Sequence, residues 1–188
     1  MRIFRLCRRP FSRTPLDGRG GLLASGRWHT PRRLVYYASD SLALASLEIL
    51  VHGEPDLLPR DLVAIEVNVP AGVKVEELDT RALPRSWRRY PAPAALHRLG
   101  NAWLDRNSAS VLCVPSALVP SESNFLINPA HPDARKLRVI GKTPFQFDPR
   151  LAERLVRTGL ATVGPYSEPR MVEDYLDTYR RLAGGTSS

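Results

Sequence analysis

The sequence contains few cysteines and no long apolar run, and each shortage excludes a class of protein. Its two cysteines, Cys7 and Cys113, have no metal-ligand spacing, so we expect neither a disulfide scaffold nor a metal site. No apolar run approaches the roughly 20 residues of a membrane span, so no membrane partner is expected. The start MRIFRLCRRPF lacks the apolar stretch and cleavage site of a signal peptide, which favours a cytoplasmic protein.

The charge is strongly positive but dispersed. The net charge of +8 comes mainly from arginine and suggests an acidic or phosphate-bearing partner. The basic residues occur as scattered pairs, at positions 8–9, 32–33, 88–89 and 180–181, without one block of interleaved aromatics. Direct nucleic-acid binding is therefore not expected, and a non-catalytic nucleic-acid-binding module stays the alternative from a different class.

Short strand patterns outnumber helical ones, which predicts a mixed α+β domain. Residues 62–70 alternate as a half-buried strand, with Val63, Ile65, Val67 and Val69 on one face. Further strands are expected at 2–6, 34–38, 110–114, 124–128 and 137–141, and helices at 41–52 and 92–107, joined by a Gly-rich loop at 15–27 and by turns at 71–91. The domain is predicted to span residues 1–155, and residues 156–188 to form an extension with an amphipathic helix.

The helix predicted at 41–52 contains an anomaly. Its residues are apolar around most of the helical wheel, which predicts a buried helix, with Ser39 and Asp40 as candidate N-caps. Glu48 and His52 nevertheless share one face with Ser41 and Ala45. An ionised Glu facing a packed core is costly unless it is paired, so a solvated cleft or a bound partner is expected beside this face.

Three blocks of the chain resemble the RES domain, a family named for its Arg, Glu and Ser, over roughly residues 3–155. GRWHTPRRLVYYASDSLALASLEILVH is similar to the family's GGRW…YxSxSxALAxLExxVH block, with Arg27, Tyr37, Glu48 and His52 in matching positions. This chain has His29 where the family often has Asn after the GRW triplet. The sequence therefore does not determine the shape of that loop.

Two later blocks extend the resemblance. VPSALVPSESNFLINPAHPD, residues 114–133, is similar to the family's VPS…N.LINP.HPD block and contains Ser116 and Asn128. PFQFDPRL, residues 144–151, resembles its closing segment. The segment after residue 155 has no counterpart in the family pattern, so its helix serves either dimerisation, which we favour, or antitoxin docking.

The resemblance implies a toxin of a bacterial type II toxin–antitoxin pair with a fold similar to that of ADP-ribosyltransferases, in which small sheets carry flanking helices. It implies NAD as the substrate, consumed by phosphorolysis or hydrolysis, or used for ADP-ribosyl transfer to a protein. We favour phosphate over water as the acceptor and expect no metal. The implied partner is an Xre-like antitoxin, and we expect a homodimer within the complex.

The candidate residues suit this chemistry. Cleavage of the nicotinamide–ribose bond passes through an oxocarbenium-like state, which the Glu48 carboxylate would stabilise. Arg27 would bind the NAD pyrophosphate with its bidentate fork, with Arg19 as a helper. Tyr37 would stack on the nicotinamide ring, and Tyr36, on the opposite strand face, would then point away.

Three further residues have a functional and a structural reading. His52 lies one helical turn beyond Glu48 and either contacts the carboxylate or a phosphate, or simply suits the helix C-terminus. Ser116 and Asn128, at strand ends, either bind ribose or the nicotinamide amide, or form turns. Ser116 is counted with Glu48 and Arg27 as catalytic because the family's name includes it.

Overall fold

The computed structural model describes residues 1–52 and 59–151. Of these, residues 1–52 and 59–146 belong to one compact unit, and residues 147–151 belong to a second. The elements of the first unit, in chain order, are β1 (Arg2–Arg8), η1 (Arg9–Ser12), α1 (Gly20–Leu23), β2 (Tyr36–Ser39), α2 (Leu42–His52), β3 (Leu62–Asn68), β4 (Val75–Glu77), η3 (Thr80–Ala82), α3 (Ala94–Arg106), β5 (Val111–Pro115), β6 (Ser123–Ile127), η4 (Pro132–Lys136) and β7 (Arg138–Phe145). The predicted boundary at residue 155 and the helix in 156–188 lie outside the described residues and stay predictions.

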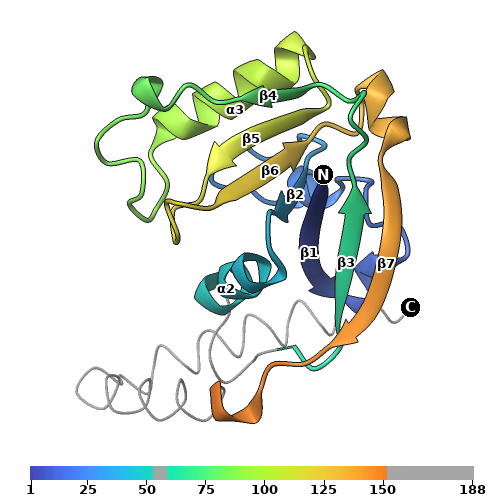
Figure 1. Cartoon of the computed structure of the whole chain (residues 1–188). Helices are drawn as coiled ribbons and strands as arrows, with labels where there is room; N and C mark the ends of the chain where they lie inside the picture. Colours follow the sequence, from blue (N-terminus) through green and yellow to red (C-terminus); the bar gives the residue numbers. More distant parts are fainter. Residues whose placement is uncertain (53–58, 152–188) are drawn as a thin grey trace, which may run out of the picture. The chain divides into compact units, whose positions relative to one another are not determined.

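Within the described residues, seven strands form one mixed sheet in the order β4-β5-β6-β2-β1-β3-β7 (Figure 1). β4 and β5 are parallel, whereas the other neighbouring strands are antiparallel. β1 and β2 share a single paired position, Phe4 with Ser39, while β1 and β3 pair along their whole lengths. This narrow joint separates two small halves, β4-β5-β6-β2 and β1-β3-β7. The predicted mixed α+β class with flanking helices is confirmed.

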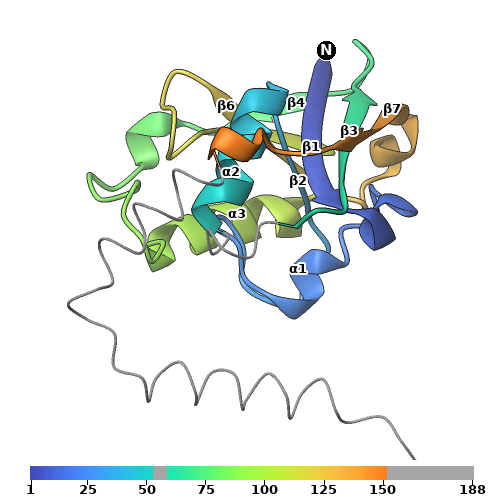
Figure 2. The same ribbon diagram turned by 90° about the horizontal axis from the view of Figure 1, so that it is seen from below.

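Alternation along the strands places apolar side chains on both faces of the sheet. One core cluster contains Val63, Ile65, Val67 and Val69, which confirms the face predicted for residues 62–70. The other cluster lies under α3, which runs along the second face of the β5–β6 half (Figure 2). Its members are Trp28, Val35, Leu96, Trp103, Leu112, Val114 and Leu126.

Gly100 allows α3 to approach the chain at Trp28. A Cβ added at Gly100 would lie 1.8 Å from the Trp28 carbonyl oxygen, so only glycine fits there. Trp28 is itself 2% exposed and belongs to the core. Because Trp28 follows Arg27 directly, this contact fixes the position of the backbone that carries the candidate arginine.

α2 begins within one residue of its prediction, but two expectations about it are wrong. Ser41, not Ser39 or Asp40, caps the helix, since its Oγ accepts the Leu44 N–H at 3.0 Å. The helix is also buried on one side only. It packs against β1 and β2, while Leu47 and Val51 on its outer side are 41% and 60% exposed.

Two short elements occur where only loops or turns were expected. α1 lies within the Gly-rich loop, and β4 lies within the turn region at 71–91. Neither is long enough to show a period of apolar residues in the sequence. Within the described part of the chain, no helix has the length and hydropathy that crossing a lipid bilayer demands.

Candidate active site around Glu48

The face of α2 that carries Ala45 and Glu48, with the capping residue Ser41, forms a polar stripe that faces the beginning of β6. The Ser41 hydroxyl donates to Glu122 Oε2 at 2.9 Å, and Asn124 Nδ2 donates to Glu48 Oε1 at 2.7 Å. Ala45, on the same stripe, is 5% exposed. Glu122 directly precedes β6, and Asn124 is its second residue. The stripe is therefore polar because the strand end that it faces is polar.

Glu48 is joined to the sheet by two hydrogen bonds in series. Asn124, whose Nδ2 donates to Glu48, also accepts the Ser39 hydroxyl at its Oδ1, at 2.7 Å. Ser39 is 4% exposed and lies directly opposite Asn124 in the β2–β6 register. Directly opposed side chains lie on one face of a sheet, which brings these two within hydrogen-bonding distance. Asn124 is a neutral donor, so this contact holds the Glu48 carboxylate without neutralising it.

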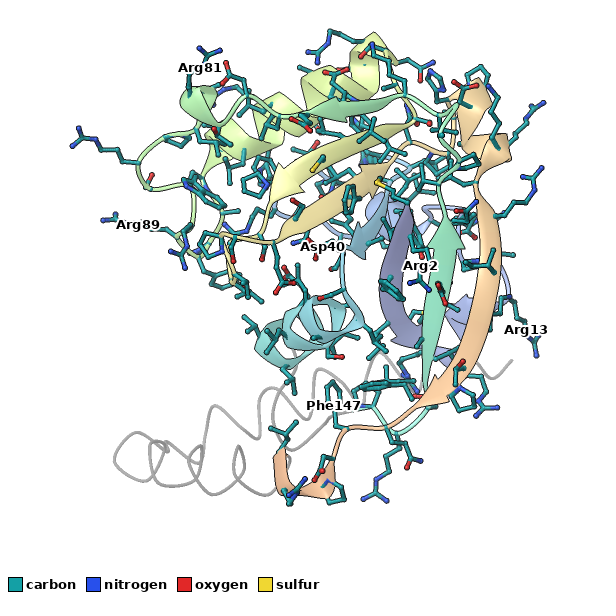
Figure 3. The ribbon with its side chains drawn as sticks, viewed as in Figure 1. Arg2, Arg13, Asp40, Arg81, Arg89 and Phe147 are labelled. Atoms are coloured by element: carbon teal, nitrogen blue, oxygen red, sulfur yellow. The ribbon has the colours of Figure 1, made fainter. Side chains whose placement is uncertain are left out.

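The chain leading into α2 is fixed to β6 by a further pair. The Asp40 N–H donates to the Ser123 carbonyl oxygen at 3.1 Å, and Asp40 Oδ2 accepts the Ser123 N–H at 2.9 Å. Figure 3 shows Asp40 where β2 leads into α2, beside the beginning of β6. The helix that carries Glu48 and the strand that carries Asn124 are thus joined by contacts that do not involve Glu48.

Arg27 lies in the same neighbourhood but is engaged with the protein. Its Nη1 donates to the carbonyl oxygens of Trp87, at 2.8 Å, and Arg89, at 3.1 Å. Burial lowers the pKa of the Arg27 guanidinium, while the nearby charge of Glu48 raises it. Arg27 and Glu48 are therefore close enough to interact electrostatically. The arginine also fixes the turn at residues 84–89 beside the site.

Tyr37 presents its hydroxyl to the loop that carries Arg27. The hydroxyl oxygen lies 2.8 Å from His29 Nδ1 and accepts the Trp28 N–H at 3.3 Å. Burial raises the pKa of this phenol, so Tyr37 is neutral at physiological pH. Gly26 is required here, because an added Cβ would lie 2.8 Å from the Tyr37 hydroxyl.

The hydrogen bonds of His29 identify its tautomer. The Gly26 N–H, which can only donate, lies 3.1 Å from Nδ1, and the Ala24 carbonyl oxygen, which can only accept, lies 3.1 Å from Nε2. The proton is therefore on Nε2, and Nδ1 accepts from Gly26 and Tyr37. Burial lowers the pKa of His29, which is 3% exposed, and favours the same neutral form.

Tyr36 points to the opposite face, as predicted for neighbours on a strand. It is 1% exposed within the core cluster around Ile3 and Cys7, and its ring lies 4.6 Å from the Arg5 guanidinium carbon. Only Tyr37 of the pair shares a face with the Arg27 loop.

Ser116 lies at the Glu48 end of β5 and β6 and shapes the adjoining loop. Its side chain is fully buried, and its Oγ accepts the N–H groups of Leu118 and Val119, both at 3.1 Å. Its own N–H donates to the Glu122 carbonyl oxygen at 3.0 Å. Ser116 thus supports the loop that leads to Glu122 and Asn124.

Asn128 and Arg19 are not brought to Glu48. Asn128 follows the other end of β6, four residues or about 13 Å from Asn124. Its side chain is bound to Asn107 and to the Ala130 N–H. Arg19 is 80% exposed and lies 3.6 Å from Asp17. The side chain of His52 lies outside the described part.

Sequence reasoning missed Asn124, Ser39 and the contacts of His29. Asn124 stands in the family block as the N of N.LINP, which was the available signal, but its partner is distant in the chain. Among the described residues, no group of three or more His, Cys, Asp or Glu side chains is arranged to hold a metal ion.

Comparisons with known proteins agree with the resemblance noted in the sequence. The family model described as RES domain matches residues 2–148. A Prs ADP-ribosylating toxin of Sphingobium sp. (strain YBL2) is 34% identical over 148 residues, which cover 78% of this chain and 92% of that protein. A Toxin Res of Pseudomonas putida (strain KT2440) is 41% identical over 126 residues, which cover 66% of this chain and 84% of that protein.

One solved structure shares the fold. A chain of the crystal structure of the M. tuberculosis MbcT–MbcA toxin–antitoxin complex matches with a TM-score of 0.63 and 16% sequence identity. The match covers 82% of this chain and 87% of that chain. At this identity the likeness concerns the arrangement of the elements alone.

Proposed function

The chain belongs to the RES domain family, and from this premise we propose that it is a toxin of a toxin–antitoxin pair that consumes NAD by cleaving the nicotinamide–ribose bond. Relatives that match most of its length carry the names Toxin Res and Prs ADP-ribosylating toxin, which supports a toxin acting on NAD. The observation that carries the proposal is the Glu48 carboxylate, held at 2.7 Å by Asn124 and near enough to Arg27 to shift the pKa of its guanidinium.

Glu48 is the residue that meets the reacting bond in this proposal. When nicotinamide departs with the bonding electron pair, positive charge develops at the anomeric carbon of ribose. A fixed carboxylate beside that carbon stabilises the charge as it forms. Asn124 supports this role because it orients the carboxylate without neutralising it.

Arg27 and Tyr37 bind the substrate in this proposal. Nη1 of Arg27 serves two carbonyl oxygens, and within the described part Nε and Nη2 have no hydrogen bond, so they remain to bind the pyrophosphate. The ring of Tyr37, whose hydroxyl is fixed by His29, would stack on nicotinamide. Ser116 acts through the loop that it shapes, and contacts of His52, Asn128 and Arg19 with NAD stay predictions.

We favour inorganic phosphate over water as the acceptor. A phosphate oxygen would form the new bond to the anomeric carbon as the bond to nicotinamide breaks, which yields phosphorylated ADP-ribose and free nicotinamide. A second candidate is ADP-ribosyl transfer to a protein, which the name of the Sphingobium relative favours. The same residues would serve both reactions, because only the acceptor differs.

The proposed partner is an antitoxin protein that covers the Glu48 site. This rests on the MbcT–MbcA complex, one chain of which shares this fold, and we expect the antitoxin to be Xre-like and the toxin to be a homodimer in the complex. A nucleic-acid-binding module, the alternative from another class, would instead bind DNA or RNA with an affinity that falls with salt and survives loss of Glu48.

Labelled NAD tests the proposal and separates its two forms. The purified protein, free of antitoxin, is incubated with NAD labelled in its ADP-ribose part, with and without inorganic phosphate and in the presence of cell extract. Phosphorylated ADP-ribose or free ADP-ribose is expected from small acceptors, whereas label on a protein indicates transfer. Unchanged NAD with no labelled protein under every condition would rule out both reactions.

A further inference from the structure

Asn124 donates a hydrogen bond from the sheet to Glu48, and Asn124 in turn accepts one from Ser39. We propose that Asn124 and Ser39 are positioning residues that fix the orientation of the Glu48 carboxylate for the reaction. This inference rests on the proposed function. It assigns roles to two residues that the sequence reading did not select.

The direction of the two hydrogen bonds carries the argument. An amide side chain has a donating end and an accepting end, and only the donating end suits a carboxylate. The Ser39 hydroxyl donates to Asn124 Oδ1 at 2.7 Å and thereby favours the rotamer that turns Nδ2 toward Glu48. Without that hydroxyl, the amide can turn over and present an oxygen to the carboxylate, which repels it.

The three residues come from three separate elements that are tied together. Ser39 ends β2, Asn124 lies opposite it in β6, and Glu48 lies about two helical turns into α2. The pairs Asp40–Ser123 and Ser41–Glu122 hold the same elements together independently. Loss of the Ser39 hydroxyl should therefore disturb the orientation of the carboxylate without separating α2 from β6.

Asn124→Asp is the sharpest variant because it keeps the size of the side chain. One carboxyl oxygen can still accept from Ser39, while the other would stand about where Nδ2 lies, 2.7 Å from Glu48 Oε1. Two carboxyl groups this close repel each other and titrate as a coupled pair, in which one pKa is raised. The Glu48 carboxylate is then held less well in place, and any proton that the pair shares reduces the charge that Glu48 offers to the reaction.

The test compares kcat and KM for NAD across pH in four variants. Asn124→Asp should lower kcat about 100-fold at pH 7, with a pH dependence that differs from that of the wild type, and Ser39→Ala should lower kcat about tenfold, both with KM within about threefold. Asn68→Asp, on β3 between Arg2 and Arg138, controls for the added charge. Ser46→Ala, which removes a hydroxyl bound to Leu42 within α2, controls for the lost hydroxyl. Both controls should match the wild type.

A second measurement works without turnover. The carboxyl carbon of Glu48 is followed by NMR through a pH titration in the wild type and in Asn124→Asp. A titration that moves to higher pH in the variant supports the positioning role even if the wild type does not consume NAD, in which case only the proposed function fails. If the wild type consumes NAD while Asn124→Asp keeps its kcat at every pH and its Glu48 titration is unchanged, the positioning role is overturned.

Discussion

Arg27 Nη1 lies 2.8 Å from the carbonyl oxygen of Trp87, so the proposed phosphate-binding arginine also holds the turn beside the site. Its guanidinium therefore has two tasks, one structural and one toward the substrate. A lysine carries a point charge on a flexible stem and lacks the planar fork of the guanidinium. It could therefore neither hold the turn nor bind the phosphate in the same geometry.

Arg27→Lys should raise KM for NAD about tenfold or more and change kcat less, because binding of the pyrophosphate is weakened in the ground state and in the transition state alike. The measurement is steady-state turnover of NAD. Arg98→Lys, an exposed arginine on α3, is the matched control and should behave as the wild type. A large fall in kcat with unchanged KM would mean that Arg27 acts on the reacting bond instead.

Ser116→Ala distinguishes the loop role of this serine from direct contact with the substrate. Removal of Oγ leaves the N–H groups of Leu118 and Val119 without their acceptor, which should lower the free energy of unfolding by about 1–3 kcal/mol. Chemical denaturation measures this loss. A variant as stable as the wild type but with kcat reduced 100-fold would instead favour direct contact.

Gly100→Ala should destabilise the protein by about 3 kcal/mol or more, because the new Cβ would meet the Trp28 carbonyl oxygen and force α3 away from the core. Gly72→Ala is the matched control, since a Cβ built there has no described heavy atom within 4 Å apart from those of Gly72 and its two chain neighbours. It should change the free energy of unfolding by less than about 1 kcal/mol. Equal effects of the two substitutions would contradict the packing described for α3.

His29 should make the folded protein sensitive to mild acid. Burial lowers its pKa in the folded state below the ordinary value of 6.5, so the unfolded chain binds the proton more readily. The stabilising contribution of neutral His29 is complete above about pH 6.5 and is lost as the pH falls below that value toward the lowered folded pKa. His29→Asn cannot take up this proton, so its free energy of unfolding should fall less than that of the wild type between about pH 7 and pH 5. Parallel curves for the two proteins would show that His29 is not the group concerned.

The local pattern of apolar and polar residues predicted most of the elements and the strand faces at Val63 to Val69 and at the Tyr36–Tyr37 pair. It did not predict contacts between residues that are remote from each other in the sequence. The polarity of the α2 stripe is explained by Asn124, which is 76 residues from Glu48, and no local spacing indicates that contact.

The exposed side of α2 was also beyond the sequence pattern. A helix whose residues are apolar on most sides is expected to be buried, but its sequence does not show how much of its surface the sheet can cover. Here Leu47 and Val51 are left exposed. The sequence pattern also could not tell which strand-end residues lie near Glu48. Ser116 and Asn128 both follow a strand, yet the antiparallel pairing of β5 and β6 places Ser116 at the Glu48 end and Asn128 at the opposite end.

The measurement that tests the central claim most directly is NAD consumption by purified wild type and Glu48→Gln, with and without inorganic phosphate and with products resolved by mass. Glu48→Gln keeps the size of the side chain but removes the charge, and should be slower by about 100-fold or more. Glu66→Gln, a carboxylate paired with Arg2 on the sheet, is the control and should match the wild type. We predict NAD loss in the wild type that is faster with phosphate and yields phosphorylated ADP-ribose. Equal NAD loss in the wild type and Glu48→Gln would contradict the assignment of Glu48 as the residue that stabilises the transition state.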